Sequence, residues 1–351
     1  MKIAALISGG VDSSVALHLA RQQHPGAELS AFYLKIWLEE ELAFLGECPW
    51  EEDLGYARAV CESLDVPLSV VPLQSVYYER VVEHALVELR AGCTPSPDIL
   101  CNQRIKFGAF YDFVEQPFDL VVTGHYASVE QRGGIFYLLR SPDAVKDQTY
   151  FLCNLSQEQL SRACFPIGGL QKQRVRELAN ELDLPNRDRK DSQGICFLGK
   201  INYNDFVKFH LGEEQGEIIR RDTGEVLGVH EGFWFHTIGQ RRGLGLSGGP
   251  WYVVGKDTAR NIVYIGHQSE LQKTERDTFE VAAVNWISGL PEKEGLHLKI
   301  RHGPELQPCR LIALAADRWR VDMSRPDTGV APGQYAIFYD DDICLGGGVI
   351  Q

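Results

Sequence analysis

The sequence predicts a three-part α/β chain: an N-terminal doubly wound parallel sheet, a small β-rich central domain and a C-terminal antiparallel β-barrel. Apolar strand-like runs alternate with helical patterns in the first 200 residues, which is typical of a parallel sheet. Glycine-punctuated short strands follow, and then a region that alternates apolar and polar residues. At 351 residues the chain exceeds what one core usually supports. We expect domains at 1–200, 201–273 and 274–351.

The N-terminal elements follow from apolar spacing. Lys2 to Ile7 is an apolar run that predicts the first strand, and helical spacing from Val11 to Ala20 predicts the first helix. Further strands are expected at 29–35, 68–73 and 120–123, and further helices at 54–64, 103–113 and 171–182. The polar segment 186–194 then leads out of this region near residue 200.

The later elements are shorter. Short strand-like runs at 251–255 and 262–265, between frequent glycines, indicate the central β-rich domain. Alternating runs at 296–301, 319–323 and 335–339 are the pattern of a small antiparallel barrel. We find no internal repeat.

Charge and hydropathy exclude some classes of protein. No run approaches the ~18 apolar residues of a membrane span, and the opening MKIAALISGG is too short for a signal peptide. We therefore expect a cytoplasmic protein without membrane association. The 35 basic and 48 acidic residues give a net charge of -13, which disfavours nucleic-acid binding unless basic residues cluster locally.

The nine cysteines do not form a structural framework. Their number is odd, and their spacing contains no C-x2-C pair, so neither a disulfide scaffold nor a zinc ribbon is predicted. No metal-ligating set is predicted. A cysteine with a special role should instead be reactive.

The string SGGVDSS at residues 8–14 predicts a phosphate site. Its glycines let a ligand approach the backbone, and the N–H groups at the start of the following helix can hold an anion. The lysine of a G-x4-G-K-[ST] loop is missing, so a γ-phosphate kinase mechanism is not indicated. The alternative is a generic glycine turn in which Ser and Asp cap the helix.

Two more positions lie at the same predicted sheet edge. Gly124, in the string TGHY that follows a later strand, would permit close approach of a nucleotide. Leu34, near the end of the second strand, is placed to touch an adenine, although a plain core role explains it equally well.

Two cysteines have chemically suggestive neighbours. Asp98 precedes Cys101 by three residues in TPSPDILCN, so both side chains could address one reacting centre. Cys196 follows Arg187, Arg189 and Lys190, and nearby cations favour the nucleophilic thiolate. For any single cysteine, a small buried apolar role is the alternative.

Together these strings resemble a known family. SGGVDSS is similar to the signature of the ATP pyrophosphatase superfamily, and PDILCN with GICF narrows the resemblance to the bacterial tRNA-specific 2-thiouridylases. The resemblance covers essentially the whole chain, with further matching strings at 146–150, 237–244 and 332–334. It implies an N-terminal fold like that of adenine nucleotide hydrolases, and cleavage of ATP to AMP and pyrophosphate.

The resemblance also implies a reaction. ATP, which we expect to arrive with Mg²⁺, would adenylylate O2 of the wobble uridine. Cys196 would carry a persulfide received from a sulfur-relay donor protein, and its terminal sulfur would attack C2. Cys101 would release that sulfur and form a disulfide with Cys196. Asp98 would act as acid or base on the uridine.

The family motifs carry binding roles onto this sequence. The implied nucleotide-binding residues are Leu6, Ile7, Ser8, Gly9, Gly10, Val11, Asp12, Ser13, Leu34 and Gly124. The implied tRNA-binding residues are Ser96, Pro97, Asp98, Lys146, Asp147, Gln148, Arg301 and His302. Three positions depart from the family pattern: Ser96 stands where Asn is common, His302 where Tyr is usual, and Leu34 where Met is common.

Local basic clusters would offset the acidic net charge. They comprise Lys172, Arg174 and Arg176; Arg187, Arg189 and Lys190; Arg241 and Arg242; and Lys299 with Arg301. We expect a monomer. The sequence leaves open which tRNAs are modified, which protein donates sulfur, and whether Cys101 and Cys196 are close together.

Two other functions compete. The chain could be a different ATP pyrophosphatase, such as an amidating ligase or another RNA-modifying enzyme, although an amidating ligase would need an ammonia source. It could also be a nucleotide-binding protein that lost its reaction. The presence of Asp98, Cys101 and Cys196 argues against a silent protein.

Overall fold

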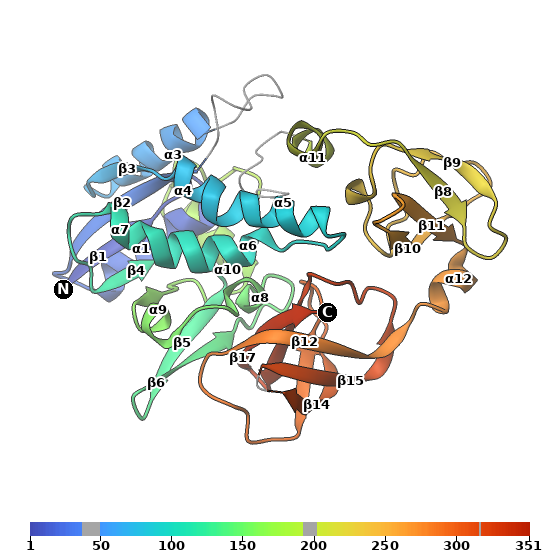
Figure 1. Ribbon diagram of the computed structural model, residues 1–351. Helices are drawn as coiled ribbons and strands as arrows, with labels where there is room; N and C mark the ends of the chain where they lie inside the picture. The colour runs from blue at the N-terminus through green and yellow to red at the C-terminus, as the bar shows by residue number, and fades with distance from the viewer. Residues whose placement is uncertain (37–49, 192–201, 316) are drawn as a thin grey trace.

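The computed structural model describes residues 1–36, 50–191, 202–315 and 317–351. Its strands form three sheets: a parallel sheet near the N-terminus, a small central sheet, and an antiparallel sheet that closes into a barrel (Figure 1). The predicted fold class is therefore confirmed.

The N-terminal sheet has the order β3-β2-β1-β4-β7, and every pairing in it is parallel. Its strands are β1 (Lys2–Leu6), β2 (Glu28–Lys35), β3 (Leu68–Pro72), β4 (Leu120–Val122) and β7 (Ala163–Cys164). Successive side chains of β1 point to opposite faces. Ile3 and Ala5 therefore belong to one core cluster, whereas Ala4 and Leu6 belong to another. Both faces of the sheet are buried, as a parallel sheet requires.

Three helices share the core of the Ile3 face: α1 (Val11–Gln23), α3 (Trp50–Ser63) and α10 (Lys172–Glu181). The opposite face is covered by α4 (Gln74–Tyr77), η1 (Tyr78–Val82), α5 (Glu83–Arg90), α6 (Pro97–Leu100), η2 (Cys101–Ala109) and α7 (Phe110–Phe113).

The segment expected to be helical from Gln103 begins earlier. Helical structure starts at Pro97 and runs to Phe113, with π-helical geometry in its middle. Proline suits the first helical position because its fixed φ is pre-set for a helix and no partner for its missing N–H is needed there. Asp98 consequently lies in the first turn of the helix that carries Cys101.

The central region has a four-stranded sheet in the order β10-β11-β8-β9. The strands are β8 (Gly216–Arg220), β9 (Val226–His230), β10 (Tyr252–Asp257) and β11 (Ile262–Gly266). The accompanying helices are α11 (Tyr203–Leu211), η3 (Phe233–Phe235) and α12 (Gln268–Gln272). In Figure 1 this unit lies at the upper right, on the opposite side of the picture from the N-terminus.

Six strands form the C-terminal barrel, in the order β12-β15-β14-β13-β16-β17, with β12 pairing to β17 to close it. They are β12 (Arg276–Trp286), β13 (Gly295–Lys299), β14 (Gln307–Ala315), β15 (Arg318–Asp327), β16 (Tyr335–Asp340) and β17 (Ile343–Ile350). Alternate side chains such as Val281, Leu298, Val321 and Phe338 fill the barrel core. Closure leaves no unpaired edge between the first and last strands.

A hairpin that the sequence analysis did not predict joins the N-terminal region to the barrel. Strands β5 (Ala127–Arg132) and β6 (Ile135–Arg140) pair with each other, and β6 pairs with β17. Two short helices, α8 (Thr149–Leu152) and α9 (Gln157–Ser161), follow it. The hairpin therefore carries residues 141–152 to the junction between the parallel sheet and the barrel.

Candidate active site

The predicted phosphate loop connects β1 to α1. Gly9 has φ of 75°, and a Cβ there would collide with the backbone of Asp53. The hydroxyls of Ser13 and Ser14 both donate to the Gly10 carbonyl at 3.0 Å. These contacts fix the loop around the N-terminus of α1, where the first backbone N–H groups have no partner within the helix and can bind an anion.

Gly124 packs directly on this loop. A Cβ at Gly124 would lie 2.7 Å from the Ser13 backbone nitrogen, so glycine lets the turn after β4 approach the N-terminus of α1. The Tyr126 hydroxyl, two residues later, donates to Asp12 Oδ1 at 2.8 Å. The strings SGGVDSS and TGHY thus form one structural unit.

The structure brings the predicted nucleotide-binding residues to one sheet edge. Leu6 ends β1, Leu34 lies near the end of β2, and Gly124 follows β4. These strands are adjacent, with β1 between the other two. The carboxyl edge of an open parallel sheet is where ligands bind in folds of this kind.

Charged side chains gather beside Asp12. Lys172 Nζ lies 2.8 Å from Asp12 Oδ1 and 2.7 Å from Asp191 Oδ1. Lys146 Nζ donates to Asp191 Oδ2 at 2.7 Å, and Arg176 also pairs with Asp191. Lys146 and Asp191 are each about one-third exposed, whereas Lys172 is 15% exposed. The cluster therefore borders the phosphate loop and remains open to solvent.

Asp98 and Cys101 lie at the start of the helix that begins at Pro97. Asp98 is half-buried and Cys101 is 4% exposed. The Cys101 backbone N–H donates to the carbonyl of Asp98, one turn earlier. The next residue, Asn102, donates its side-chain amide to the Phe151 carbonyl in α8 at 2.9 Å.

A chain of contacts joins the phosphate loop to this helix. Tyr126, which binds Asp12, donates its backbone N–H to Gln148 Oε1 at 3.0 Å. Gln148 directly precedes α8, and Phe151 of α8 accepts the hydrogen bond from Asn102. The α8 helix therefore fixes the position of Cys101 relative to the nucleotide loop.

The barrel supports the same segment. The Thr94 backbone N–H donates to the Pro332 carbonyl at 2.9 Å. A Cβ at Gly333 would lie 2.7 Å from Cys93 Cβ, so the turn 332–334 packs closely against the chain just before Ser96 and Pro97. The string PGQ, noted in the sequence, thus packs against the segment that leads into this helix.

Asp147, one of the expected tRNA contacts, is a buried charge. Its side chain is fully buried and accepts hydrogen bonds from Lys299 Nζ at 2.9 Å, Arg140 Nε at 3.0 Å and Thr149 Oγ1 at 2.7 Å. Burial raises the pKa of Asp147, but Lys299 and the other donors outweigh it and hold the pKa below its usual range. Its carboxylate joins the barrel to α8, and contact with RNA stays a prediction.

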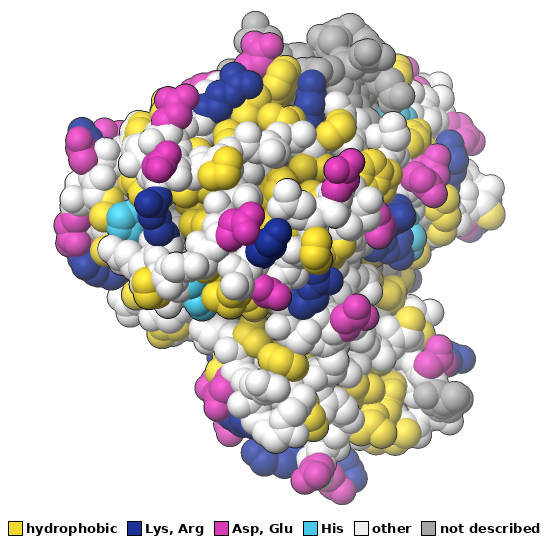
Figure 2. Space-filling view, turned by 90° about the vertical axis from the view of Figure 1, so that its left-hand side faces the viewer, with side chains coloured by type: hydrophobic (Ala, Val, Ile, Leu, Met, Phe, Trp, Pro, Cys, Tyr) yellow, Lys and Arg dark blue, Asp and Glu magenta, His cyan; other side chains and the backbone are white. Residues whose placement is uncertain are grey.

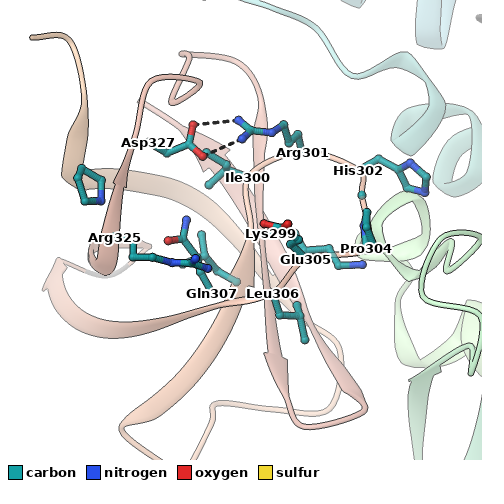
Figure 3. Close-up of a pocket in the computed structure, with 13 residues that line it drawn as sticks. Lys299, Ile300, Arg301, His302, Pro304, Glu305, Leu306, Gln307, Arg325 and Asp327 are labelled. Carbon is teal, nitrogen blue, oxygen red and sulfur yellow. Dashed lines mark hydrogen bonds and ion pairs between the residues drawn. The ribbon is translucent and has the colours of Figure 1, made fainter. Parts of the chain in front are cut away.

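Arg301 and His302 lie on the barrel loop after β13 (Figure 3). This loop borders a cavity of about 510 Å³. Arg301 forms a bidentate pair with Asp327, at 2.9 and 2.8 Å, and remains exposed. His302 stacks on Phe151 with ring centroids 4.8 Å apart, and burial lowers its pKa, which favours the neutral imidazole. His302 therefore presents an aromatic face beside α8.

Charge on the exposed surface is mixed. On the face drawn in Figure 2, Lys and Arg side chains are interspersed with Asp and Glu. Within the described residues, no helix has the length and apolar composition needed to cross a membrane.

Comparison with known proteins decides the family. Three family models match in succession: a tRNA methyl transferase HUP domain over residues 1–200, a tRNA methyl transferase PRC-barrel domain over 204–267, and an aminomethyltransferase beta-barrel domain over 276–350. The tRNA-specific 2-thiouridylase MnmA 1 of Bacteroides thetaiotaomicron is 45% identical over all of this chain and 99% of its own length. The chain belongs to the tRNA-specific 2-thiouridylase family.

Other thiouridylases match equally well. MnmA 2 of Bacteroides fragilis and MnmA of Porphyromonas gingivalis are each 45% identical over the whole of this chain, covering 100% and 99% of their own lengths. Among solved structures, the U34-tRNA thiolase NcsA of Methanococcus maripaludis has a TM-score of 0.36 and 15% identity, over 59% of this chain and 64% of that chain. That likeness is too distant to carry an argument.

The family's second expected cysteine, Cys196, lies outside the described residues, as does Cys48. Burial raises the pKa of Cys61 and Cys164 to about 11 and that of Cys309 and Cys344 to about 12. These thiols are protonated at neutral pH and are poor nucleophiles. We therefore do not expect these four thiols to take part in sulfur transfer in this thiouridylase-family chain.

The sequence analysis missed two site residues. Tyr126, although part of TGHY, was given no role, and Asp191 was not singled out. Lys172 and Arg176 were noted only as members of a basic helix. Their i, i+4 spacing places both on one face of α10, and that signal could have predicted that they act together.

Proposed function

We propose that this chain catalyses the ATP-dependent 2-thiolation of the wobble uridine of tRNA. The observation that carries the proposal is the full-length match, at 45% identity, to relatives named tRNA-specific 2-thiouridylase. The site geometry supports it, because a phosphate-binding loop and the Asp98–Cys101 helix are joined through α8. Neither observation supports the two alternatives, a different ATP pyrophosphatase or a nucleotide-binding protein that lost its reaction.

In the first step, O2 of the uridine attacks the α-phosphorus of ATP and pyrophosphate leaves. The backbone N–H groups at the start of α1 would hold the departing phosphates, and Leu34 would pack on the adenine. Mg²⁺ would arrive with ATP. Among the described residues, no group of three or more His, Cys, Asp or Glu side chains is placed to hold a metal ion, so phosphate oxygens and water would supply most of its ligands.

In the second step, sulfur replaces the activated oxygen. The terminal sulfur of a Cys196 persulfide attacks C2, and AMP leaves with the original O2. The Cys101 thiolate then attacks Cys196 Sγ and breaks the S–S bond, which releases 2-thiouridine and leaves a Cys101–Cys196 disulfide. An external thiol reductant must open that disulfide before the next turnover. Asp98, one turn from Cys101, would act as the acid or base that donates a proton to the uridine or accepts one from it.

The target uridine must leave the anticodon stack to enter this site, as is usual when single-stranded loop bases are read. Ser96, Pro97 and Asp98 would contact it, and His302 would stack on an RNA base beside Phe151. We further propose that Gln148 and Arg301 contact the RNA, whereas Lys146, which the family resemblance also assigns to tRNA, pairs with Asp191 beside the phosphate loop. A sulfur-relay protein would supply the persulfide to a monomeric enzyme in the cytoplasm.

The test is incubation of the purified protein with ATP, unmodified tRNA and a sulfide source, followed by nucleoside analysis. We expect 2-thiouridine, with AMP and pyrophosphate as coproducts. Cys101→Ser and Cys196→Ser should each abolish 2-thiouridine, whereas the matched control Cys309→Ser should retain it because Cys309 is a buried barrel residue. ADP as the nucleotide product, or full activity of Cys101→Ser, would contradict the proposal.

A further inference from the structure

Three basic side chains converge on the carboxylate of Asp191. Lys146 Nζ and Lys172 Nζ each lie 2.7 Å from an Asp191 oxygen, and Arg176 pairs with the same carboxylate. They come from two elements, because Lys172 and Arg176 lie one turn apart on α10 and Lys146 lies in the segment before α8. We call Lys146, Lys172 and Arg176 the cation cluster.

The chain around Asp191 is attached to the phosphate loop. Asn186 Nδ2 donates to the Gly9 carbonyl at 2.8 Å and to Ser14 Oγ at 2.9 Å, and Arg189 donates to the same Gly9 carbonyl at 3.1 Å. Lys172 also bridges Asp191 to Asp12 of the loop. The cation cluster therefore lies next to the anion-binding N-terminus of α1.

The charges in this region suit a more highly charged anion than one carboxylate. The cation cluster carries three positive charges, and three carboxylates lie beside it: Asp12, Asp191 and Asp143, which accepts hydrogen bonds from the backbone N–H groups of Lys146 and Lys172. Displacement of Asp191 would leave the three cations with one carboxylate fewer. A diphosphate group offers more negative charge and more acceptor oxygens than a carboxylate, and both Lys and Arg bind phosphate well.

We propose that the cation cluster binds the β- and γ-phosphates of ATP, and the pyrophosphate formed from them, and that the Asp191 carboxylate is an internal anion that competes for the same three cations. The inference rests on the proposed function only in taking ATP as the substrate. It assigns Lys172 the role that the lysine of a G-x4-G-K-[ST] loop plays elsewhere, although Lys172 comes from a helix about 160 residues later in the chain.

The competing carboxylate is ionised at neutral pH. Burial raises the pKa of Asp191, but hydrogen bonds from Lys146 and Lys172 outweigh it and hold the pKa well below its usual range. Asp191 therefore remains a negatively charged competitor at neutral pH, and only a stronger anion can displace it.

The test is calorimetric titration of the full-length protein with inorganic pyrophosphate, in the absence of tRNA. Asp191→Asn should bind pyrophosphate about tenfold more tightly than the unaltered protein, because the competitor loses its charge. Lys172→Gln should bind about tenfold or more weakly. The matched control is Arg174→Gln on the same helix, whose exposed side chain pairs with Glu177 and Glu181 and should leave the affinity unchanged.

The proposal predicts opposite changes in pyrophosphate affinity for Asp191→Asn and Lys172→Gln, so either variant can refute it. A residue that only stabilised the fold would weaken binding when changed, so tighter binding by Asp191→Asn supports competition. Unchanged or weaker binding by that variant would overturn the inference, as would unchanged binding by Lys172→Gln. Lys146→Gln should weaken pyrophosphate binding in the same way as Lys172→Gln, and it leaves the contact between Lys172 and Asp12 in place. Because the readout requires no thiolation, a protein that binds pyrophosphate as expected yet forms no 2-thiouridine would contradict only the proposed function.

Discussion

Replacing Lys299 with methionine should destabilise the protein far more than replacing an exposed lysine. Lys299 and Asp147 are both fully buried and their charged atoms are 2.9 Å apart. Lys299→Met would leave the Asp147 carboxylate inside the protein with only Arg140 and Thr149 as partners. A buried charge that loses its counter-ion is costly because water cannot replace the partner.

The magnitude follows from burial. Breaking a buried ion pair typically costs about 3–5 kcal/mol. Since Arg140 remains at 3.0 Å, we expect the lower end, about 3 kcal/mol of unfolding free energy. Lys293 is the matched control: it also lies in the barrel region and pairs with Asp340 at 2.7 Å, but it is 61% exposed. Lys293→Met should cost less than about 1 kcal/mol.

Urea unfolding followed by circular dichroism and tryptophan fluorescence measures both variants. The Asp147→Asn/Lys299→Met double variant should recover part of the loss because no buried carboxylate is left unpaired. The cost of Lys299→Met should also shrink as the pH falls, because protonation of the Asp147 carboxyl in the variant removes the buried charge that lost its partner. Equal costs for Lys299→Met and Lys293→Met, or a cost independent of pH, would refute the reasoning.

Three further predictions concern stability, nucleotide binding and RNA binding. Burial raises the pKa of Glu88 to about 7. The folded state therefore binds more protons than the unfolded state between about pH 4.5 and 7, and stability falls as pH rises through that window. In urea unfolding, Glu88→Gln should raise the free energy of unfolding by on the order of 2 kcal/mol at pH 8 and leave it unchanged at pH 4. Gly124→Ala places a Cβ 2.7 Å from Ser13 N and should weaken ATP binding at least tenfold in calorimetry; unchanged affinity would contradict the close packing. Arg301→Ala should weaken tRNA binding and lower the salt slope by about one if it contacts one phosphate, and an unchanged slope would remove it from the RNA surface.

Local sequence was sufficient for much of the fold. The strand-turn-helix unit at Lys2 to Gln23 was predictable because apolar periodicity, glycines and helix-starting residues lie within one short segment. The placement of Asp98 and Cys101 one turn apart on a helix was also predictable, since three residues along a helix is a fixed spacing. The hairpin β5–β6 was missed although Gly133-Gly134 between its strands is a local turn signal. Only the pairing of β6 with β17, some 200 residues later, depends on the tertiary structure.

The candidate site, like the fold, was predictable only in part from the sequence. Residue types and motif strings alone indicated a nucleotide loop, a reactive cysteine beside a carboxylate, and the thiouridylase family, because these signals are carried by contiguous residues. Only the tertiary structure decided that Asp147 is a buried counter-ion of Lys299, that Tyr126 holds Asp12, and that the cation cluster encloses Asp191. Those roles depend on burial and on ion pairs between residues up to 160 positions apart. Linear spacing carries no record of such contacts, since the free energy of a charge is set by its three-dimensional surroundings.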